Sequence, residues 1–295
     1  MDTITHTLFG LAIYGAVDKR EFSKKEKHAL LFTAIAGSQI PDIDVVSQLW
    51  DTGGQYQMWH RGLTHSIFMV PLFAMILYGF SRLIWKVKSS FYFWIGALAV
   101  FIHNTSDLFN AWGTGYLEPF SSVRVTFGTI PIVDFVFWGI LLLSWLVSRY
   151  SKRFLKHHVF RAAWGLIILH VIFQTTQGYI IYNQYEERYE EMALSASFVP
   201  GQFSVIGKNG EDVSIYKASL FREDSVQYEL TSAKEVDLDS LFEKVPEAET
   251  LYEWAPFVVI VDDGEKIGIY DPRFYRNGQS FLFEYMESRE LQGDK

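Results

Sequence analysis

The sequence predicts an α-helical integral membrane domain over residues 1–182, followed by a small, mainly antiparallel β or α+β domain over residues 183–295. Apolar runs that approach the roughly 20 residues needed to cross a bilayer occur only in the first part. The charge balance also changes: residues 1–182 carry 15 Lys/Arg against 10 Asp/Glu, and residues 183–295 carry 11 against 24. This change of composition near Asn183 places the domain boundary.

Two short apolar runs open the chain, at residues 4–17 and 29–40. Each is shorter than a membrane span, so we expect a short helical hairpin packed inside the helix bundle. Longer runs at residues 66–83, 91–102, 131–147 and 160–181 predict four full spans. No basic leader followed by a cleavage signal is recognisable, so a signal peptide is not expected.

The basic residues predict the orientation. The connections 18–27, 82–90 and 149–161 hold 13 Lys/Arg, whereas the connections 41–65 and 108–130 hold only Arg61 and Arg124. By the positive-inside rule the first set is cytoplasmic. We therefore expect a multi-pass protein of the cytoplasmic membrane, with residues 183–295 on the extracytoplasmic side. The absence of cysteine excludes a disulfide framework and a thiolate metal site.

The acidic second domain carries the pattern of a small antiparallel sheet. Turn signals at Asn209-Gly210 and Asp263-Gly264 separate two pairs of runs and predict hairpins. Helices are expected around residues 183–192 and 237–244. The short runs rich in β-branched and aromatic residues are 203–206, 213–216, 226–230, 257–261, 267–270 and 281–283.

Four polar islands interrupt the apolar half of the chain and hold seven potential metal ligands. Histidines and carboxylates are costly near a membrane, so their clustering there suggests a functional site. By topology all four islands lie at the outer membrane surface. The seven residues are His6, Asp42, Asp44, His60, His65, His103 and Asp107.

Each island alone has a simpler explanation. His103 and Asp107 lie one helical turn apart on one face and could bind one cation, although such a pair is more often a buried hydrogen bond. His60 and His65 flank Gly62, which could turn both imidazoles to one point or leave them as surface loop histidines. Pro41-Asp42-Ile43-Asp44 could cap a helix with one of its two carboxylates. A lone His6 in an apolar helix is usually a core residue.

Together the islands predict a metal centre. Imidazole with carboxylate suits zinc, manganese or iron better than calcium or magnesium. We expect a divalent metal, zinc first and manganese as the alternative. Four histidines and three aspartates exceed the ligands of one tetrahedral ion, so one or two ions are possible, with Asp107 as the natural bridge between two.

The same islands carry a resemblance to a known family. Thr5-His6, Pro41-Asp42-Ile43-Asp44, the segment His60-Arg61-Gly62-Leu63-Thr64-His65-Ser66, and His103-Asn104-Thr105-Ser106-Asp107 followed by Gly113-Thr114 resemble the YdjM-like membrane-bound metal-dependent hydrolases of bacteria. The resemblance covers about residues 1–180.

That family is distantly similar to zinc-dependent phospholipase C and the related single-strand nucleases. The resemblance implies two metals held by His103, Asp107, His6, one of the Asp42/Asp44 pair and one of the His60/His65 pair. Two features depart from those enzymes: Met1 stands where they have an N-terminal tryptophan ligand, and the His-x-x-x-Glu helix of their third metal is missing.

The function expected from these residues is hydrolysis of a phosphoester in a lipid or envelope substrate by metal-activated water, at the outer face of the cytoplasmic membrane. Arg61 would clamp the phosphate, with Arg124 as a weaker candidate. Asp134 would orient a ligand histidine or act as base, although helix capping is about as common a role. The bilayer is the expected partner; no nucleic-acid partner is expected, and no protein partner of the second domain is predicted.

Two other classes of protein fit the same residues: a metal-containing membrane scaffold or regulator, and an ion transporter without hydrolytic activity. Transport predicts polar groups spread through the depth of the membrane. Because the islands gather at one end, the pattern favours chemistry at the surface.

Overall fold

The computed structural model describes residues 1–151 and 153–287. It divides into two compact units: Met1–Asp44 with Arg61–Thr176, and Val45–His60 with Gln177–Lys295. The last eight residues of the predicted second domain, 288–295, lie outside the described residues.

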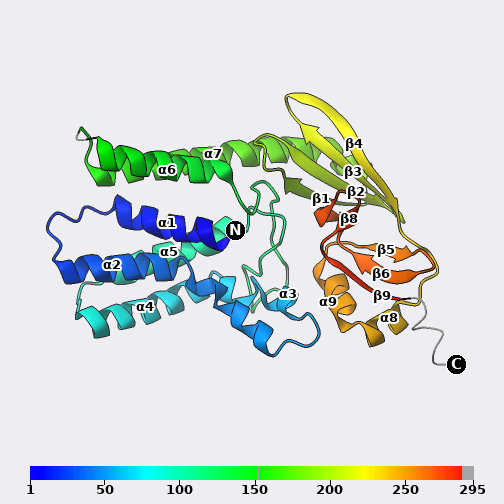
Figure 1. Ribbon diagram of the computed structural model, residues 1–295, viewed down its shortest axis with the longest axis horizontal. Coiled ribbons are helices and arrows are strands. Elements are labelled where there is room, and N and C mark those ends of the chain that lie inside the picture. Colours follow the sequence, from blue (N-terminus) through cyan, green and yellow to red (C-terminus); the bar gives the residue numbers. More distant parts are fainter. Residues whose placement is uncertain (152, 288–295) are drawn as a thin grey trace. The chain divides into compact units, whose positions relative to one another are not determined.

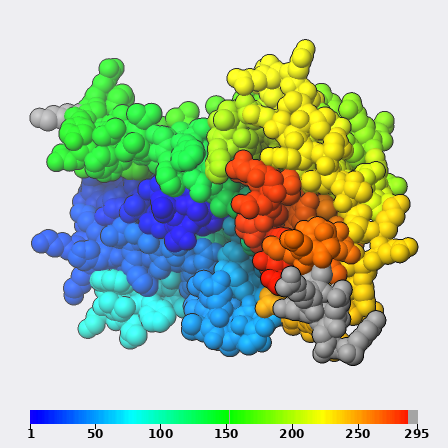
Figure 2. Space-filling view, turned by 45° about the vertical axis from the view of Figure 1, so that its right-hand side comes forward, coloured from blue at the N-terminus to red at the C-terminus, as the bar shows by residue number. Residues whose placement is uncertain are grey.

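The first unit is helical. Its central helix is α5, which packs against α1, α2 and α4 (Figure 1). Figure 2 shows α1 in dark blue between the green surface of α6 and α7 and the lighter blue of α2. The helices are α1 (Thr3–Ala16), α2 (Lys24–Gly37), α4 (Met69–Trp85), α5 (Phe91–Asp107), α6 (Phe135–Tyr150) and the part of α7 (Lys156–Tyr185) up to Thr176.

Small residues allow α1, α2 and α5 to approach closely. A Cβ at Gly10 of α1 would lie 2.9 Å from the Ala34 carbonyl oxygen of α2, and a Cβ at Gly37 would lie 2.8 Å from the Ala99 side chain of α5. Asp2 caps α1, and Ser23 caps α2 in a capping box with Glu26. The predicted N-terminal hairpin therefore exists as two short helices whose buried residues, such as Phe9 of α1 and Leu30 of α2, form part of the core of the bundle.

The prediction of four full spans is wrong. Among the described residues, one helix, Lys156–Arg188, is long and apolar enough to cross a membrane, and the number rises to three only if each of two bent helix pairs forms one span. A helix of the length of α4 or α5 extends about 25 Å, less than the roughly 30 Å hydrocarbon core. In α5 the last turns are also polar, because they carry His103, Asn104 and Asp107.

The second unit is mainly β. It holds an antiparallel sheet in the order β1-β2-β3-β4, a three-stranded sheet in the order β5-β6-β9, and the short pair β7-β8. The strands are β1 (Glu191–Ala196), β2 (Phe203–Asn209), β3 (Asp212–Ser219), β4 (Arg222–Thr231), β5 (Val259–Asp262), β6 (Lys266–Tyr270), β7 (Tyr275–Arg276), β8 (Gln279–Ser280) and β9 (Phe283–Glu287). Its helices are α3 (Tyr56–Trp59), α8 (Leu238–Lys244) and α9 (Pro246–Trp254).

The predicted β domain is present, but its start differs from the prediction and helix α9 was not predicted. Both predicted hairpin turns occur, between β2 and β3 and between β5 and β6, and α8 occupies the helix expected around residues 237–244. A helix was expected over residues 183–192. Instead α7 ends at Tyr185, and β1 begins at Glu191 as the edge strand beside β2. Tyr189 covers Gly207 of β2, where a Cβ would lie 2.3 Å from the tyrosine ring, so this segment pairs with the sheet.

Candidate metal centre

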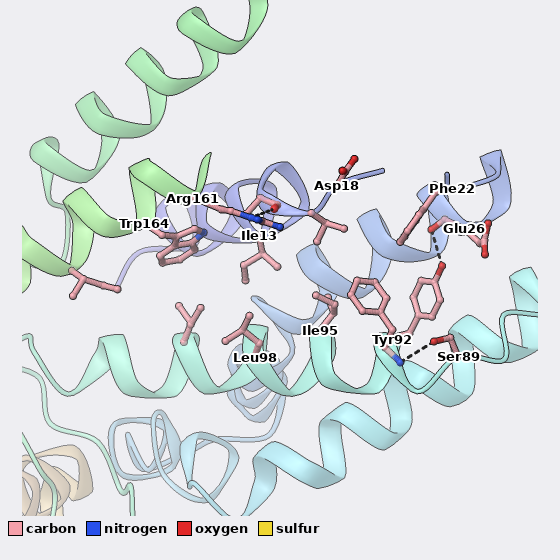
Figure 3. A pocket seen from close by; sticks show the side chains of 15 residues that line it. Ile13, Asp18, Phe22, Glu26, Ser89, Tyr92, Ile95, Leu98, Arg161 and Trp164 are labelled. Carbon is pink, nitrogen blue, oxygen red and sulfur yellow. Dashed lines mark hydrogen bonds between the residues drawn. The ribbon is translucent and has the colours of Figure 1, made fainter. Parts of the chain in front are cut away.

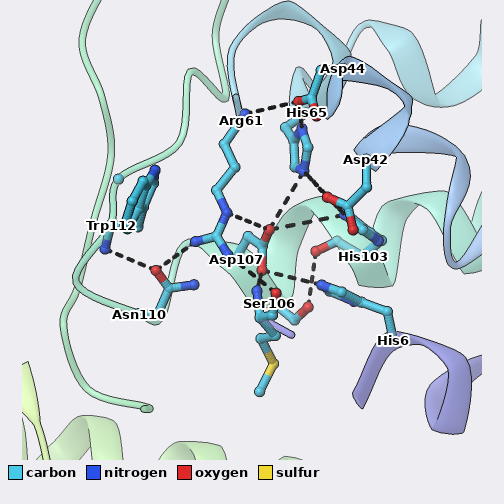
Figure 4. Close-up of polar contacts among 12 residues, drawn as sticks. His6, Asp42, Asp44, Arg61, His65, His103, Ser106, Asp107, Asn110 and Trp112 are labelled. Atoms are coloured by element: carbon cyan, nitrogen blue, oxygen red, sulfur yellow. Dashed lines mark hydrogen bonds and ion pairs between the residues drawn. The ribbon is translucent and has the colours of Figure 1, made fainter. Parts of the chain in front are cut away.

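Four separate segments of the helical unit bring five of the predicted ligands together (Figure 4). His6 comes from the start of α1, Asp42 from the 3-10 helix η1 (Ile40–Leu49), and His65 from the 3-10 helix η2 (Leu63–His65). His103 and Asp107 come from the last turns of α5. The three histidines and Asp107 are fully buried, and Asp42 is partly exposed.

The side-chain nitrogen and oxygen atoms of this cluster lie as close together as atoms that surround one common point. Nε2 of His65 lies 3.1 Å from Nε2 of His103 and 3.3 Å from an Asp42 oxygen. The same Asp42 oxygen is 3.4 Å from Nε2 of His103, and Oδ2 of Asp107 is 3.5 Å from Nε2 of His65. His6 stacks on His103, with ring centroids 3.7 Å apart, and its Nε2 is 3.4 Å from Oδ1 of Asp107.

Neighbouring groups orient two of the histidines. Nδ1 of His103 lies 2.8 Å from the Ser38 carbonyl oxygen, which can only accept, so this nitrogen carries the proton. Nδ1 of His65 lies 3.0 Å from Oγ1 of Thr64, and that hydroxyl donates to Asp44. A proton on each Nδ1 leaves each Nε2 with a lone pair directed into the cluster.

Two such lone pairs only 3.1 Å apart repel each other unless a positive species lies near both. His6 adds two more polar atoms whose hydrogen-bonding capacity is unused, because both of its buried ring nitrogens lack a hydrogen-bond partner among the described residues. Buried polar atoms without partners are uncommon in folded proteins. The donor set of imidazoles and carboxylates fits a divalent cation such as zinc or manganese.

Asp107 is also surrounded by cationic and donor groups. Nε of Arg61 lies 3.1 Å from its Oδ2, and the Met1 amino group contacts its Oδ1. Burial is the main cause that lowers the pKa of this amino group well below its usual value. Arg61 also donates to Asn110 Oδ1 at 2.7 Å and to the Met1 carbonyl oxygen at 3.2 Å. The predicted phosphate clamp is therefore a buried guanidinium that holds Asp107.

Asp44 and His60 lie differently from the other predicted ligands. Oδ2 of Asp44 accepts from the Arg61 backbone N–H and from the Thr64 hydroxyl, both at 3.0 Å. Through Thr64, Asp44 supports the Nδ1 side of the His65 ring. His60 belongs to the second unit, where it stacks on Tyr56 with ring centroids 5.0 Å apart.

Asp134, the other predicted catalytic residue, caps α6. Its Oδ1 accepts from the backbone N–H groups of Val136 and Phe137, and its Oδ2 lies 3.0 Å from Nε2 of His170. The contacts described for Asp134 are with these residues, and none of them is among the seven predicted ligands.

Four residues of the centre were not predicted from sequence: Met1, Ser38, Thr64 and Asn110. Thr64 precedes a predicted ligand, and a hydroxyl next to a histidine is a usable signal for an orienting group. Asn110 follows Asp107 by three residues, but α5 ends between them, so helical spacing does not relate the two. Ser38 acts through its backbone carbonyl group, which no sequence pattern identifies.

Comparison with known proteins identifies the family. The profile described as "YdjM inner membrane protein" matches residues 1–181. "Uncharacterized protein YfhP" of Bacillus subtilis (strain 168) is 36% identical over 142 residues, which make up 46% of this chain and 43% of YfhP. The match thus spans less than half of that relative, and no solved structure matches the chain. The chain belongs to the YdjM inner membrane protein family.

Proposed function

We propose that the protein is a metal-dependent hydrolase of the cytoplasmic membrane that cleaves a phosphoester of a lipid or envelope substrate. The observation that carries the proposal is the convergence of Asp42, His65, His103 and Asp107, with His6 stacked behind them, in one buried cluster. The membership in an inner membrane family supports the compartment.

The cluster favours one ion at a time. Two possible ligand groups lie wholly within the helical unit, His6 with Asp42 and His103, and His65 with His103 and Asp107, and both use His103. Since Nδ1 of His103 faces the Ser38 carbonyl oxygen, only Nε2 is free to bind. We therefore propose Asp42, His65, His103 and Asp107 as the ligands of a zinc ion, with manganese as the alternative. A bound ion of this kind supplies a Lewis acid that polarises a phosphoryl oxygen and activates water.

The protein's own groups have supporting roles in this proposal. Thr64 and Ser38 hold the two histidine rings, and Arg61 orients Asp107 and offsets its charge. To clamp a phosphate as well, Arg61 would have to release Asn110 or Met1. Because Asp134 contacts His170, we assign it to the packing of α6 and α7 and leave the general base unassigned.

The proposed site faces the extracytoplasmic side, with the second unit on the same side. The support is the concentration of Lys and Arg in the connections 18–27, 82–90 and 149–161. A periplasmic-type reporter fused after Glu191 is expected to be active. Activity of a cytoplasmic reporter at that position would contradict the orientation.

Metal analysis of the detergent-purified full chain tests the centre. We expect about one divalent ion per chain, lost in His65→Ala and Asp107→Ala and retained in the control His28→Ala, which removes an exposed histidine of α2. Unchanged metal content in the first two variants would refute the site.

The hydrolytic step needs a separate assay. Release of phosphate or head group from membrane phospholipids and polyprenyl phosphates is expected for the wild type and should stop with a chelator and in both ligand variants. A chain that binds metal normally and releases nothing would instead be a metal-containing scaffold or regulator. Metal uptake into sealed vesicles would identify a transporter.

A further inference from the structure

A second feature of the helical unit lies along the outer side of α1, where this helix meets α6 and the start of α7. It is a groove of about 790 Å³. Its walls are apolar and partly aromatic, with Leu8, Leu11, Trp138, Leu142, Trp145 and Phe160 among the lining residues. Leu142 is 56% exposed and Trp145 is 52% exposed, so these side chains form an open surface.

One end of the groove is cationic. Lys19 follows α1, Arg149 lies in the last turn of α6, and Lys156 begins α7; all three line the groove. Among the described lining residues there is no Asp or Glu. The nearest carboxylate in sequence, Asp18, is already paired with Arg20 at 2.7 Å.

The cleft on the other side of α1 has a different character (Figure 3). It has a similar volume, about 820 Å³, and is also largely apolar. Its polar lining includes two carboxylates, Asp18 and Glu26, and one cation, Arg161, whose Nε donates to the Ala16 carbonyl oxygen at 3.0 Å. An excess of positive charge therefore distinguishes the α1/α6 groove.

A simpler explanation covers only part of this arrangement. Lys19 donates to the carbonyl oxygens of Tyr14 and Val17 and so satisfies acceptors at the end of α1. Arg149 and Lys156 are exposed and extend from two different helices to the same end of the same groove. Helix capping by Lys19 explains neither their convergence nor the apolar channel that leads to them.

We infer that this groove binds an anionic glycerophospholipid, with the phosphate against Lys19, Arg149 and Lys156 and one acyl chain along α1 and α6. Basic pockets between the helices of membrane proteins bind the head groups of anionic lipids in this way. The groove runs parallel to both helices, because Trp138 at the start of α6 donates to Thr5 of α1 and Arg149 at its end lies near Lys19.

The site is distinct from the metal centre. His6 and Lys19 are 13 residues apart along α1 and the turn that follows it, which corresponds to roughly 20 Å. The phosphate site therefore lies at the opposite end of α1 from the proposed ligands. A role in hydrolysis is neither required nor implied.

Lipid selectivity of the reconstituted full chain tests the inference. The probe is quenching of tryptophan fluorescence by phosphatidylglycerol with dibrominated acyl chains, diluted into phosphatidylcholine bilayers, and compared with dibrominated phosphatidylcholine at the same dilution. We expect preferential quenching by phosphatidylglycerol, and a smaller difference in Trp145→Phe, which removes a tryptophan of the groove.

The double variant Arg149→Gln/Lys156→Gln should lower the preference for phosphatidylglycerol by about fivefold or more. The matched control Lys24→Gln/Lys25→Gln also removes two exposed cations, from the start of α2 outside the groove, and should leave the preference unchanged. An equal loss in both double variants would show attraction by net charge alone and would overturn the site. If inorganic phosphate instead reduces quenching equally for both dibrominated lipids, with no preference between them, the three cations bind a free anion and not a lipid head group. That result would also overturn the site.

Discussion

The two ends of α1 present polar groups in opposite ways. At its start, His6 faces inward to a cluster in which the three histidines and Asp107 are fully buried and Asp42 is partly exposed. After its end, Lys19 joins Arg149 and Lys156 at the rim of an open apolar groove. Buried ionisable groups destabilise a fold unless they are compensated, whereas exposed cations do not. The first site should therefore be coupled to the stability of the protein, whereas the exposed Arg149 and Lys156 of the second should affect mainly its choice of lipid.

The largest effect is expected from Asp107→Ala. This substitution leaves Arg61 and the cluster histidines without their central carboxylate, and loss of one partner of a buried ion pair destabilises by about 3–5 kcal/mol. Thermal unfolding of the detergent-solubilised chain would measure the change. Asp107→Asn keeps the shape and should fold better than Asp107→Ala while still losing metal. Wild-type stability in Asp107→Ala would show that the carboxylate is uncoupled from the fold.

Removal of the metal should have the next largest effect. A ligand that binds only the folded state and is present at about a thousand times its dissociation constant stabilises by about 4 kcal/mol. A chelator should therefore lower the unfolding temperature of the wild type. The same treatment should leave Asp107→Ala and His65→Ala almost unchanged, because their centre is already empty. An equal shift in all three proteins would place the chelator's effect elsewhere.

The support behind His65 allows a finer test. Thr64→Val keeps the shape of the side chain but removes the hydroxyl that links His65 to Asp44, and loss of such a supporting contact weakens metal binding by about 10–100-fold. Thr176→Val makes the same change at an exposed helical position and should have no effect. Metal titration would compare the two variants. Equal affinities would mean that the His65 ring needs no support from Thr64.

The sequence predicted which His and Asp side chains lie together better than it predicted the helices around them. The His103 and Asp107 pair could be predicted because helical spacing fixes which side chains share a face. The choice between Asp42 and Asp44 could not, because it depends on the path of a 3-10 helix that places one carboxylate in the cluster and the other behind His65.

The length of the spans was mispredicted for a related reason. Apolar runs give no information on where a helix bends, and two helix pairs are broken next to the centre. In the second unit the turns at Asn209-Gly210 and Asp263-Gly264 were recognisable from their glycines. The edge strand β1 was not, because its pairing is decided by contacts such as Tyr189 on Gly207.

The smallest expected effect concerns the pH dependence of the lipid groove. Burial lowers the pKa of Lys19 to about 8, and Lys27 and Lys156 act in the same direction, against the opposing charge of Asp18. Its ammonium group therefore loses its proton as the pH rises through about 8, while Arg149 keeps its charge. The preference for phosphatidylglycerol should fall over this range by no more than the roughly fivefold effect of one cation. Lys19→Arg keeps the charge at every pH, so its preference should stay level. If this variant shows the same decline as the wild type, another group titrates in this range and Lys19 does not bind the phosphate.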